Sequence, residues 1–158
     1  MAAQAPSGPR VRVAALIVHD GRVVTVRHRA GENRYHLLPG GGVGYRETLG
    51  DALVREVREE TGLEISLGRP VILSDTIDPE GPRHVINILF LAQTIGGEVT
   101  TCPEDARVEA VDLVTIDELH DLDLRPPWAE SIARLLSEDA APCTEYLGPL
   151  FSSGRKDS

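Results

Sequence analysis

The stretch LPGGGVGYRETLGDALVREVREETGLEI, from Leu38 to Ile65, joins a glycine-rich loop to a helical pattern that ends among carboxylates. Thr48 followed three residues later by Asp51 is a capping-box pattern, which predicts that a helix begins just after Thr48. Gly62 suits the left-handed position that ends a helix. The glycines before the helix allow the backbone to turn sharply and to approach another group closely. Read alone, they are equally typical of a flexible connection between a strand and a helix.

Three glutamates fall on the side of this helix that its apolar residues occupy. At about 100° per residue, Glu56 and Glu60 lie within the apolar sector, Glu59 lies at its edge, and Arg58 faces water. This placement has three costs. The carboxylates repel one another at this spacing, their negative charge near the helix C-terminus opposes the helix dipole, and burial of an unpaired carboxylate is unfavourable. A divalent cation resolves all three conflicts, because Mg²⁺ prefers hard oxygen ligands and shares its shell with substrate phosphates. The alternative is a solvated acidic helix whose glutamates pair with Arg55 and Arg58.

Composition excludes several classes of function. The chain has 158 residues and a formal charge of −9, from 25 acidic and 16 basic residues, which argues against nonspecific nucleic-acid binding. No apolar run approaches the roughly 18 residues of a membrane span, so no membrane partner is expected. Two isolated cysteines, Cys102 and Cys143, predict a reducing, cytoplasmic location. The beginning of the sequence, MAAQAPSGPR, lacks an apolar signal core and predicts a flexible arm over residues 1–10.

Strand patterns surround the helix on both sides. Asp20-Gly21 predicts a hairpin turn between the first two strands, and Gly96-Gly97 predicts another hairpin that returns through EVTT. The expected strands are Val11–Val18, Val23–His28, Tyr35–Leu38, Val71–Ile77, His84–Thr94 and Glu109–Ile116. The segment PPWAESIARLLSE predicts a second helix, with Trp128 packing it against the sheet. We expect one mixed α/β domain over residues 11–137, with a helix on each side of a sheet, and a weakly specified tail over residues 138–158.

The glycine loop and the helix together resemble the Nudix (MutT-like) hydrolase family. The Nudix box reads G, five residues, E, seven residues, then REUxEExGU, where U is a bulky aliphatic residue. In this chain Gly41 is followed by Glu47 and by the run Arg55–Leu63, so that every fixed position of the 23-residue box is satisfied. The resemblance extends over roughly Val11 to Leu136. It implies an α/β/α sandwich and hydrolysis of nucleoside diphosphates linked to another group, with Mg²⁺ or Mn²⁺ as cofactor.

The resemblance also implies roles for individual residues. Glu56 and Glu60 are the expected metal ligands, with Glu59 joining them or standing beside them. A carbonyl of Gly40 or Gly41 is a further candidate ligand. Glu47, outside the helix, is expected to contact the metal through water or to stabilise the loop.

Two further roles, an orienting arginine and a general base, have more than one reading in the sequence. Arg55 resembles the family arginine that orients a box glutamate through a charge-assisted pair; the alternative is a surface salt bridge. In this family the base is either a box glutamate or an acid on a later loop. The candidates are therefore Glu59, Glu104, Asp105 and Glu109, and each of the last three is also explained as a solvated loop charge.

Four residues near the entry to the box are candidates for substrate binding. Candidates for phosphate and base contacts are Arg27, Arg29, Arg34 and Tyr35, which stand near the entry to the box, although ordinary surface arginines fit the same pattern. Pro79 lies 16 residues beyond Leu63 (79 − 63), where a proline resembles the marker of ADP-ribose pyrophosphatases. The alternative is that DPEGP is simply a turn.

Two classes of function remain open. The first is a metal-dependent pyrophosphohydrolase acting on a small nucleotide, with ADP-ribose or a nucleotide sugar favoured over a nucleoside triphosphate as substrate. The second is a nucleotide-sensing module without turnover, which such a complete set of box glutamates disfavours. A homodimer is an expectation at the level of the family.

Overall fold

The computed structural model describes residues 8–100, 102–137 and 143–151 of the chain. The strands of these residues are β1 (Arg10–His19), β2 (Arg22–Ala30), β3 (Asn33–Leu37), β4 (Gly40–Gly42), β5 (Leu63–Ile77), β6 (His84–Gly97), β7 (Val108–Val114) and β8 (Glu145–Pro149). The helices are α1 (Leu49–Thr61), α2 (Ile116–Asp121) and α3 (Ala129–Leu135).

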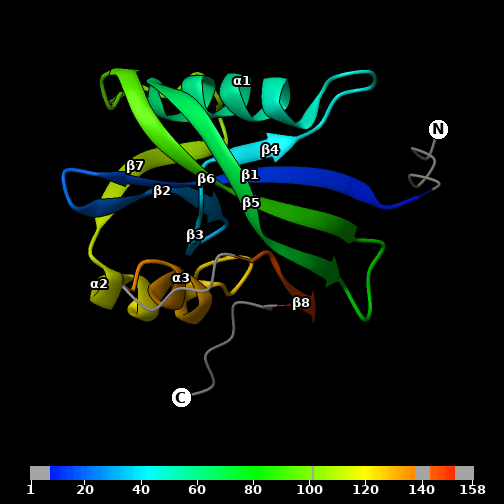
Figure 1. Cartoon of the computed structure of the whole chain (residues 1–158). Helices are drawn as coiled ribbons and strands as arrows, with labels where there is room; N and C mark the ends of the chain where they lie inside the picture. Colours follow the sequence, from blue (N-terminus) through cyan, green and yellow to red (C-terminus); the bar gives the residue numbers. More distant parts are fainter. Residues whose placement is uncertain (1–7, 101, 138–142, 152–158) are drawn as a thin grey trace.

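The strands form one mixed sheet between two helical layers. Its order is β3-β2-β1-β6-β5-β8, with β4 paired to β1 and β7 paired to β2. β1 runs parallel to β6, and β5 runs parallel to β8, whereas the remaining pairs are antiparallel. Figure 1 shows α1 over one side of the sheet and α2 and α3 over the other. The predicted mixed sheet with a helix on each side is confirmed.

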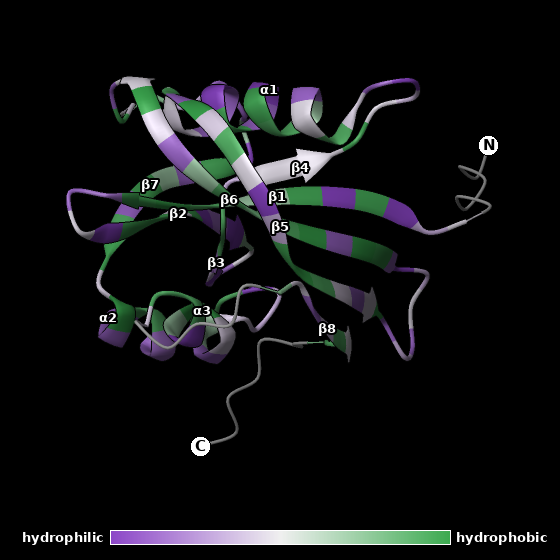
Figure 2. Ribbon diagram, in the orientation of Figure 1, coloured by the Kyte–Doolittle hydropathy of each residue, from purple (hydrophilic) through white to green (hydrophobic). Residues whose placement is uncertain are grey.

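Two apolar cores fill the spaces between these layers. Along β1, Val13, Ala15 and Ile17 belong to the core under α1, whereas the alternate residues Ala14 and Leu16 belong to the core above α2 and α3. This alternation follows from the two-residue period of a strand that is covered on both faces. In Figure 2 the side of α1 that faces the sheet is coloured hydrophobic, and its outer side is coloured hydrophilic.

The ends of α1 follow the local sequence signals. The Thr48 side chain accepts a hydrogen bond from the Asp51 N–H (3.1 Å), so the helix begins at Leu49 as predicted. Gly62 ends the helix with a left-handed φ of 78°, and its N–H donates to the Arg58 carbonyl. The Asp20-Gly21 hairpin is also confirmed, because His19 pairs with Arg22 across it.

The expected strand at Glu109–Ile116 was wrong at its end. β7 stops at Val114, and Thr115 caps a short helix, α2, that the sequence interpretation did not contain. The Thr115 side chain accepts from the Glu118 N–H while the Glu118 carboxylate accepts from the Thr115 N–H. This reciprocal capping box starts a helix at Ile116, which ends the extended conformation.

The predicted hairpin at Gly96-Gly97 was also wrong. β6 continues through both glycines and pairs them with Leu63 and Glu64, at the start of β5. β5 is correspondingly longer than the expected strand Val71–Ile77, because register shifts on both sides of Pro70 let the strand continue through this proline. Gly97, with φ of 76°, lies against the Gly62 carbonyl at a place where a Cβ atom would overlap it.

The C-terminal helix is shorter than expected, and a strand follows it. α3 covers Ala129–Leu135 only, and Trp128 precedes it. Residues 145–149 form the edge strand β8, which lies parallel to β5. The domain boundaries at residues 10 and 137 stay predictions, and residues 1–7 of the predicted arm lie outside the described residues. No helix in the described part of the chain is long and apolar enough to cross a membrane.

Trp128 packs α3 against the sheet, as predicted. Its side chain is 1% exposed, and its indole N–H donates to the Ser74 hydroxyl on β5 (3.2 Å). We predict that Trp128→Ala lowers the free energy of unfolding by about 3–5 kcal/mol, because a large cavity opens in the core. Urea denaturation followed by circular dichroism measures this change. Val54→Ala, at an exposed position of α1, is the control and should change stability by less than about 0.5 kcal/mol. A loss below about 1 kcal/mol for Trp128→Ala would contradict this packing role.

Candidate functional site

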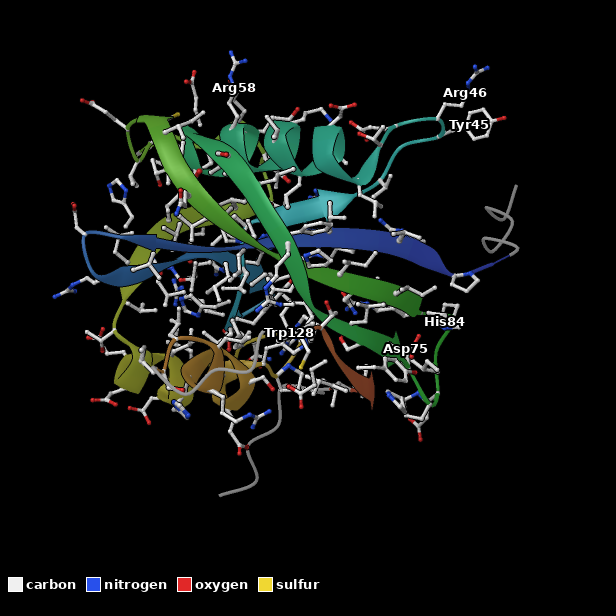
Figure 3. The ribbon with its side chains drawn as sticks, in the orientation of Figure 1. Tyr45, Arg46, Arg58, Asp75, His84 and Trp128 are labelled. Atoms are coloured by element: carbon white, nitrogen blue, oxygen red, sulfur yellow. The ribbon has the colours of Figure 1, made fainter. Side chains whose placement is uncertain are left out.

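α1 carries two buried carboxylates on its inner side. Glu56 is 8% exposed and Glu60 is 2% exposed, whereas Glu59 is half-buried. Arg58 is exposed and points away from the sheet, as predicted (Figure 3). The interpretation as a fully solvated acidic helix is therefore wrong for Glu56 and Glu60.

The glycines of β4 receive these carboxylates. β4 lies antiparallel to β1, with Gly40 opposite Ala14 and Gly41 opposite Val13. The Gly40 N–H donates to Glu60 Oε2 (2.9 Å). The Glu56 carboxylate lies directly against Gly41, where any Cβ atom would overlap it. The glycine run is therefore an ordered strand in contact with the carboxylates, and it is not a flexible connection.

A third carboxylate, Asp105, reaches the same place from the loop before β7. One oxygen from each of Glu56, Glu60 and Asp105 lies within 4.8 Å of the other two. Arg107 holds the Asp105 carboxylate through both of its oxygens (3.0 and 2.6 Å), and this hydrogen bonding lowers the pKa of Asp105. The loop is tied to α1 by a hydrogen bond from the Glu104 N–H to the Glu59 carbonyl (2.9 Å).

This carboxylate cluster, Glu56, Glu60 and Asp105, has the electrostatics of a cation site. The pKa of Glu60 is raised to about 7, chiefly by burial and also by the charges of Glu56 and Asp105, while the Gly40 N–H and Arg12 act in the opposite direction. A dication would offset both the desolvation and the repulsion. Three hard oxygen donors fit Mg²⁺ or Mn²⁺. The site predicted from α1 is therefore completed by a residue that we had considered only as a base.

Arg55 links the loop to the helix. Its guanidinium donates to both oxygens of Glu47 (2.8 and 3.0 Å), to Glu56 Oε1 (2.9 Å) and, more weakly, to Glu59 Oε2 (3.4 Å). Glu47 also accepts from the Gly44 N–H (2.8 Å), so that its carboxylate stabilises the loop. The Arg55 hydrogen bond and then the Gly44 N–H lower the pKa of Glu47 to about 2. These contacts support the predicted orienting role of Arg55.

The remaining acidic candidates are placed differently. Glu109 accepts hydrogen bonds from Arg27 (3.1 Å) and Arg34 (2.9 Å) and is not part of the carboxylate cluster. Glu104 and Glu59 line a separate hollow with Arg55, to which no residue of the carboxylate cluster contributes. Glu59 is thus linked to Glu56 through Arg55, and the Glu104 backbone is linked to Glu59, whereas Glu109 lies in an ion-pair group with Arg27 and Arg34.

A cavity of about 400 Å³ opens beside Glu60. Its polar lining consists of Arg10, Arg12, His28, Tyr35, Glu60, Arg83, His84, Arg107 and Arg125, together with the glycines of β4. Tyr35, a predicted substrate-binding residue, lines this cavity, and the Arg125 guanidinium lies over its ring, 4.3 Å from the centroid.

The arginines of this cavity are not those that we expected from the sequence. Arg27 and Arg34 pair with Glu109, Arg29 donates to the Gly31 carbonyl (2.7 Å), and none of the three lines the cavity. The sequence does contain a signal for Arg10 and Arg12 as cavity residues, because side chains at alternate positions of a strand point to the same face of the sheet. Pro79 is exposed and does not line the cavity, although Pro82 does.

Comparison with known proteins gives consistent matches. The NUDIX domain family matches residues 8–137. The chain is 34% identical to an ADP-ribose pyrophosphatase of Methanocaldococcus jannaschii, over 70% of this chain and 66% of that protein. It is 34% identical to the putative 8-oxo-dGTP diphosphatase 2 of Mycobacterium tuberculosis, over 66% of this chain and 72% of that protein. An NAD-capped RNA hydrolase, NudC, of Klebsiella pneumoniae is 30% identical over 80% of this chain, which spans 46% of that protein. A NUDIX hydrolase structure from Nitrosomonas europaea superposes with a TM-score of 0.70 at 22% identity, over 80% of this chain and 86% of that one.

Gly41 offers a test of the contact between β4 and Glu56. We predict that Gly41→Ala weakens Mn²⁺ binding by about 10- to 100-fold, because the new methyl group displaces the Glu56 carboxylate. Isothermal titration calorimetry of the metal-free protein measures the affinity. Gly42→Ala is the matched control, since a Cβ atom there meets its nearest neighbour, Arg10, at 3.6 Å. Equal Mn²⁺ affinities for the two variants would contradict the assignment.

The pKa of Glu60 predicts a pH dependence of metal affinity. Below a pH of about 7, the Glu60 carboxyl of the metal-free protein carries a proton that a cation must displace. We expect the apparent Mn²⁺ affinity to fall about tenfold per pH unit below 7, and to level off above it. Calorimetry in buffers of different ionisation enthalpy counts the released proton. An affinity that is flat between pH 5 and 7 would contradict the role of Glu60.

Proposed function

Because the chain belongs to the NUDIX domain family, we propose that it hydrolyses a diphosphate linkage in a small nucleoside diphosphate derivative. The observation that carries this proposal is the carboxylate cluster, three acidic side chains with oxygens within 4.8 Å of one another. Glu60 belongs both to this cluster and to the lining of the basic cavity. A cation site and an anion-binding cavity thus share one residue.

Each residue of the site has a part in the proposed reaction. Glu56, Glu60 and Asp105 would hold Mg²⁺ or Mn²⁺, which when bound supplies charge neutralisation at the diphosphate oxygens and makes water a stronger nucleophile. Arg55 fixes the orientation of Glu56, and Arg107 fixes that of Asp105. Both are therefore positioning residues.

A general base must reach the attacking water beside this cluster. Glu59 and Glu104 are the remaining candidates, because Arg55 connects Glu59 to Glu56 of the cluster and the Glu104 N–H donates to the Glu59 carbonyl. Glu109 is a poorer candidate, since its hydrogen bond with Arg34 lowers its pKa. The lowered pKa of Asp105 likewise makes it a weak base and a suitable metal ligand.

ADP-ribose or a nucleotide sugar is the first candidate for the substrate. The similarity to the archaeal ADP-ribose pyrophosphatase supports it. Tyr35, beneath the Arg125 guanidinium, offers a flat surface against which a base or a sugar could stack. The Pro79 marker adds no support, because this proline lies outside the cavity lining.

A nucleoside triphosphate is the second candidate. The similarity to the mycobacterial 8-oxo-dGTP diphosphatase favours it, and so does a cavity lined by five arginines. Cleavage between the α and β phosphates would release pyrophosphate. A sensing module without turnover is disfavoured, because every acidic position of the Nudix box is retained. A homodimer and a cytoplasmic location stay expectations.

Turnover with and without Mg²⁺ tests the proposed function. We predict hydrolysis of at least one compound from a panel of ADP-ribose, nucleotide sugars and nucleoside triphosphates, with products resolved by chromatography. Glu60→Gln should lower kcat by about 10³-fold or more. Its fold should survive, because the amide oxygen can still accept from the Gly40 N–H. Glu64→Gln, at an exposed carboxylate of β5, is the control and should retain activity. Nucleotide binding without turnover under either metal would favour the sensing module instead.

A further inference from the structure

The cavity beside the carboxylate cluster is strongly basic in an acidic protein. Five arginines and two histidines line it, with Glu60 as the one carboxylate of the lining in the described residues. Asp105 pairs with Arg107, and Asp123 pairs with Arg125. Counting these two acids and Glu60 against the five arginines leaves a formal charge of +2 (5 − 3), although the whole chain carries −9. The excess of positive charge indicates an anionic ligand.

Three of the five arginines have no ion pair. Within residues 8–100, 102–137 and 143–151, no carboxylate lies within salt-bridge distance of Arg10, Arg12 or Arg83. Burial lowers the pKa of Arg12 most, and the positive charges of Arg83 and Arg107 lower it further, whereas Glu60 raises it. The Arg12 guanidinium therefore interacts with both the positive charge of Arg83 and the negative charge of Glu60.

Two buried nitrogen atoms in the lining lack hydrogen-bond partners. Arg12 uses Nη2 to donate to the Leu38 carbonyl (2.8 Å), but its Nη1 is buried and unpaired among the described residues. The same holds for His28 Nε2, whose ring lies beside Tyr35. A buried guanidinium N–H without an acceptor is unfavourable, and a phosphate oxygen is the acceptor that suits it. These atoms therefore point to a ligand group that completes the cavity.

The strand register separates the two ends of the cavity. Glu60 contacts Gly40, which pairs with Ala14 of β1, whereas Arg10 pairs with Val85 at the start of β6, next to Arg83 and His84. Ala14 and Arg10 are four residues apart, about 13 Å along a strand. Figure 3 shows His84 at the end of the sheet where β6 begins. A diphosphate held at the carboxylate cluster would leave the arginines at the far end for another group.

From these contacts, and building on the proposed function, we propose that the substrate carries a phosphate group besides those of the cleaved linkage, and that Arg83 and Arg12 bind it. ADP-ribose has neutral sugars and no such group, so it would leave Arg83 without a partner. The additional phosphate can extend the phosphate chain, as in a triphosphate, or it can be a monoester on a sugar. The guanidinium fork matches a phosphate in either position.

Three adenosine compounds test this inference. ADP-ribose has no additional phosphate, ATP has one on the chain, and 2′-phospho-ADP-ribose has one on a sugar. We expect kcat/KM for ATP or for 2′-phospho-ADP-ribose to exceed that for ADP-ribose at least about tenfold, because charge-assisted hydrogen bonds are added. The preferred compound identifies the position of the phosphate.

Arg83→Gln should remove this preference. We expect kcat/KM for the preferred compound to fall about 10- to 100-fold, and that for ADP-ribose to change less than about threefold. Arg83→Lys should keep part of the preference, because it retains the charge without the fork. Arg22→Gln, at the exposed turn between β1 and β2, is the matched control and should leave all three values unchanged. Equal kcat/KM values for the three compounds, or an equal loss on all of them in Arg83→Gln, would overturn the inference and leave the hydrolase function intact.

Binding separates this inference from the proposed function. Calorimetry of the same three nucleotides with Glu60→Gln, and with Glu60→Gln combined with Arg83→Gln, needs no turnover. A preference for the additional phosphate that disappears with Arg83 supports the inference even if the wild-type protein hydrolyses nothing. Equal affinities for the three nucleotides overturn it.

Discussion

The repulsion among Glu56, Glu60 and Asp105 is the constraint on which the rest of the site depends. Three carboxylates with oxygens within 4.8 Å of one another, two of them buried, cannot all ionise without compensation. The protein supplies part of it through the Gly40 N–H and the Arg107 guanidinium. The pKa of Glu60, about 7, shows that this compensation is incomplete without a cation. The site is therefore built to be completed by positive charge.

Several features of the box sequence follow from holding these groups in place. A side chain at Gly41 would occupy the position of the Glu56 carboxylate, and one at Gly97 would overlap the Gly62 carbonyl where the helix joins β5. Arg55 connects Glu47 in the loop to Glu56 on the helix, so that one guanidinium fixes the distance between loop and helix. Gly41 and Arg55 therefore set the position of the Glu56 carboxylate, whereas Gly97 sets the join between the helix and β5.

The limits of sequence prediction follow from the range of the interactions. Thr48 and Gly62 act on neighbouring residues, so the ends of α1 could be read locally. Asp105 reaches the cluster through the hydrogen bond between Glu104 and Glu59, 45 residues apart (104 − 59), and no local pattern encodes that contact. Arg27 and Arg34 looked equally suited to phosphate binding, but Glu109 pairs with both. The parallel pairing of β1 with β6 brings Arg10 beside Arg83 instead, and only the tertiary fold specifies it.

The positive charge of the cavity explains how a protein with a net charge of −9 can bind the proposed anionic substrate. At physiological ionic strength, charges more than about 8 Å apart across solvent are largely screened, so the acidic surface has little influence inside the cavity. The half-buried Arg12 is screened less, because protein surrounds it and lowers the local dielectric, whereas Arg10 and Arg83 are exposed and act mainly by their proximity to a ligand in the cavity. The substrate therefore experiences mainly Arg10, Arg12 and Arg83, together with any cation at the carboxylate cluster. Along β1, the lining changes from the carboxylate of Glu60 beside Gly40 to Arg10, which pairs with Val85 and has no ion pair among the described residues. In the proposed complex, this difference between the two ends would favour an elongated polyanion with its additional phosphate at the arginines and its diphosphate at the carboxylate cluster.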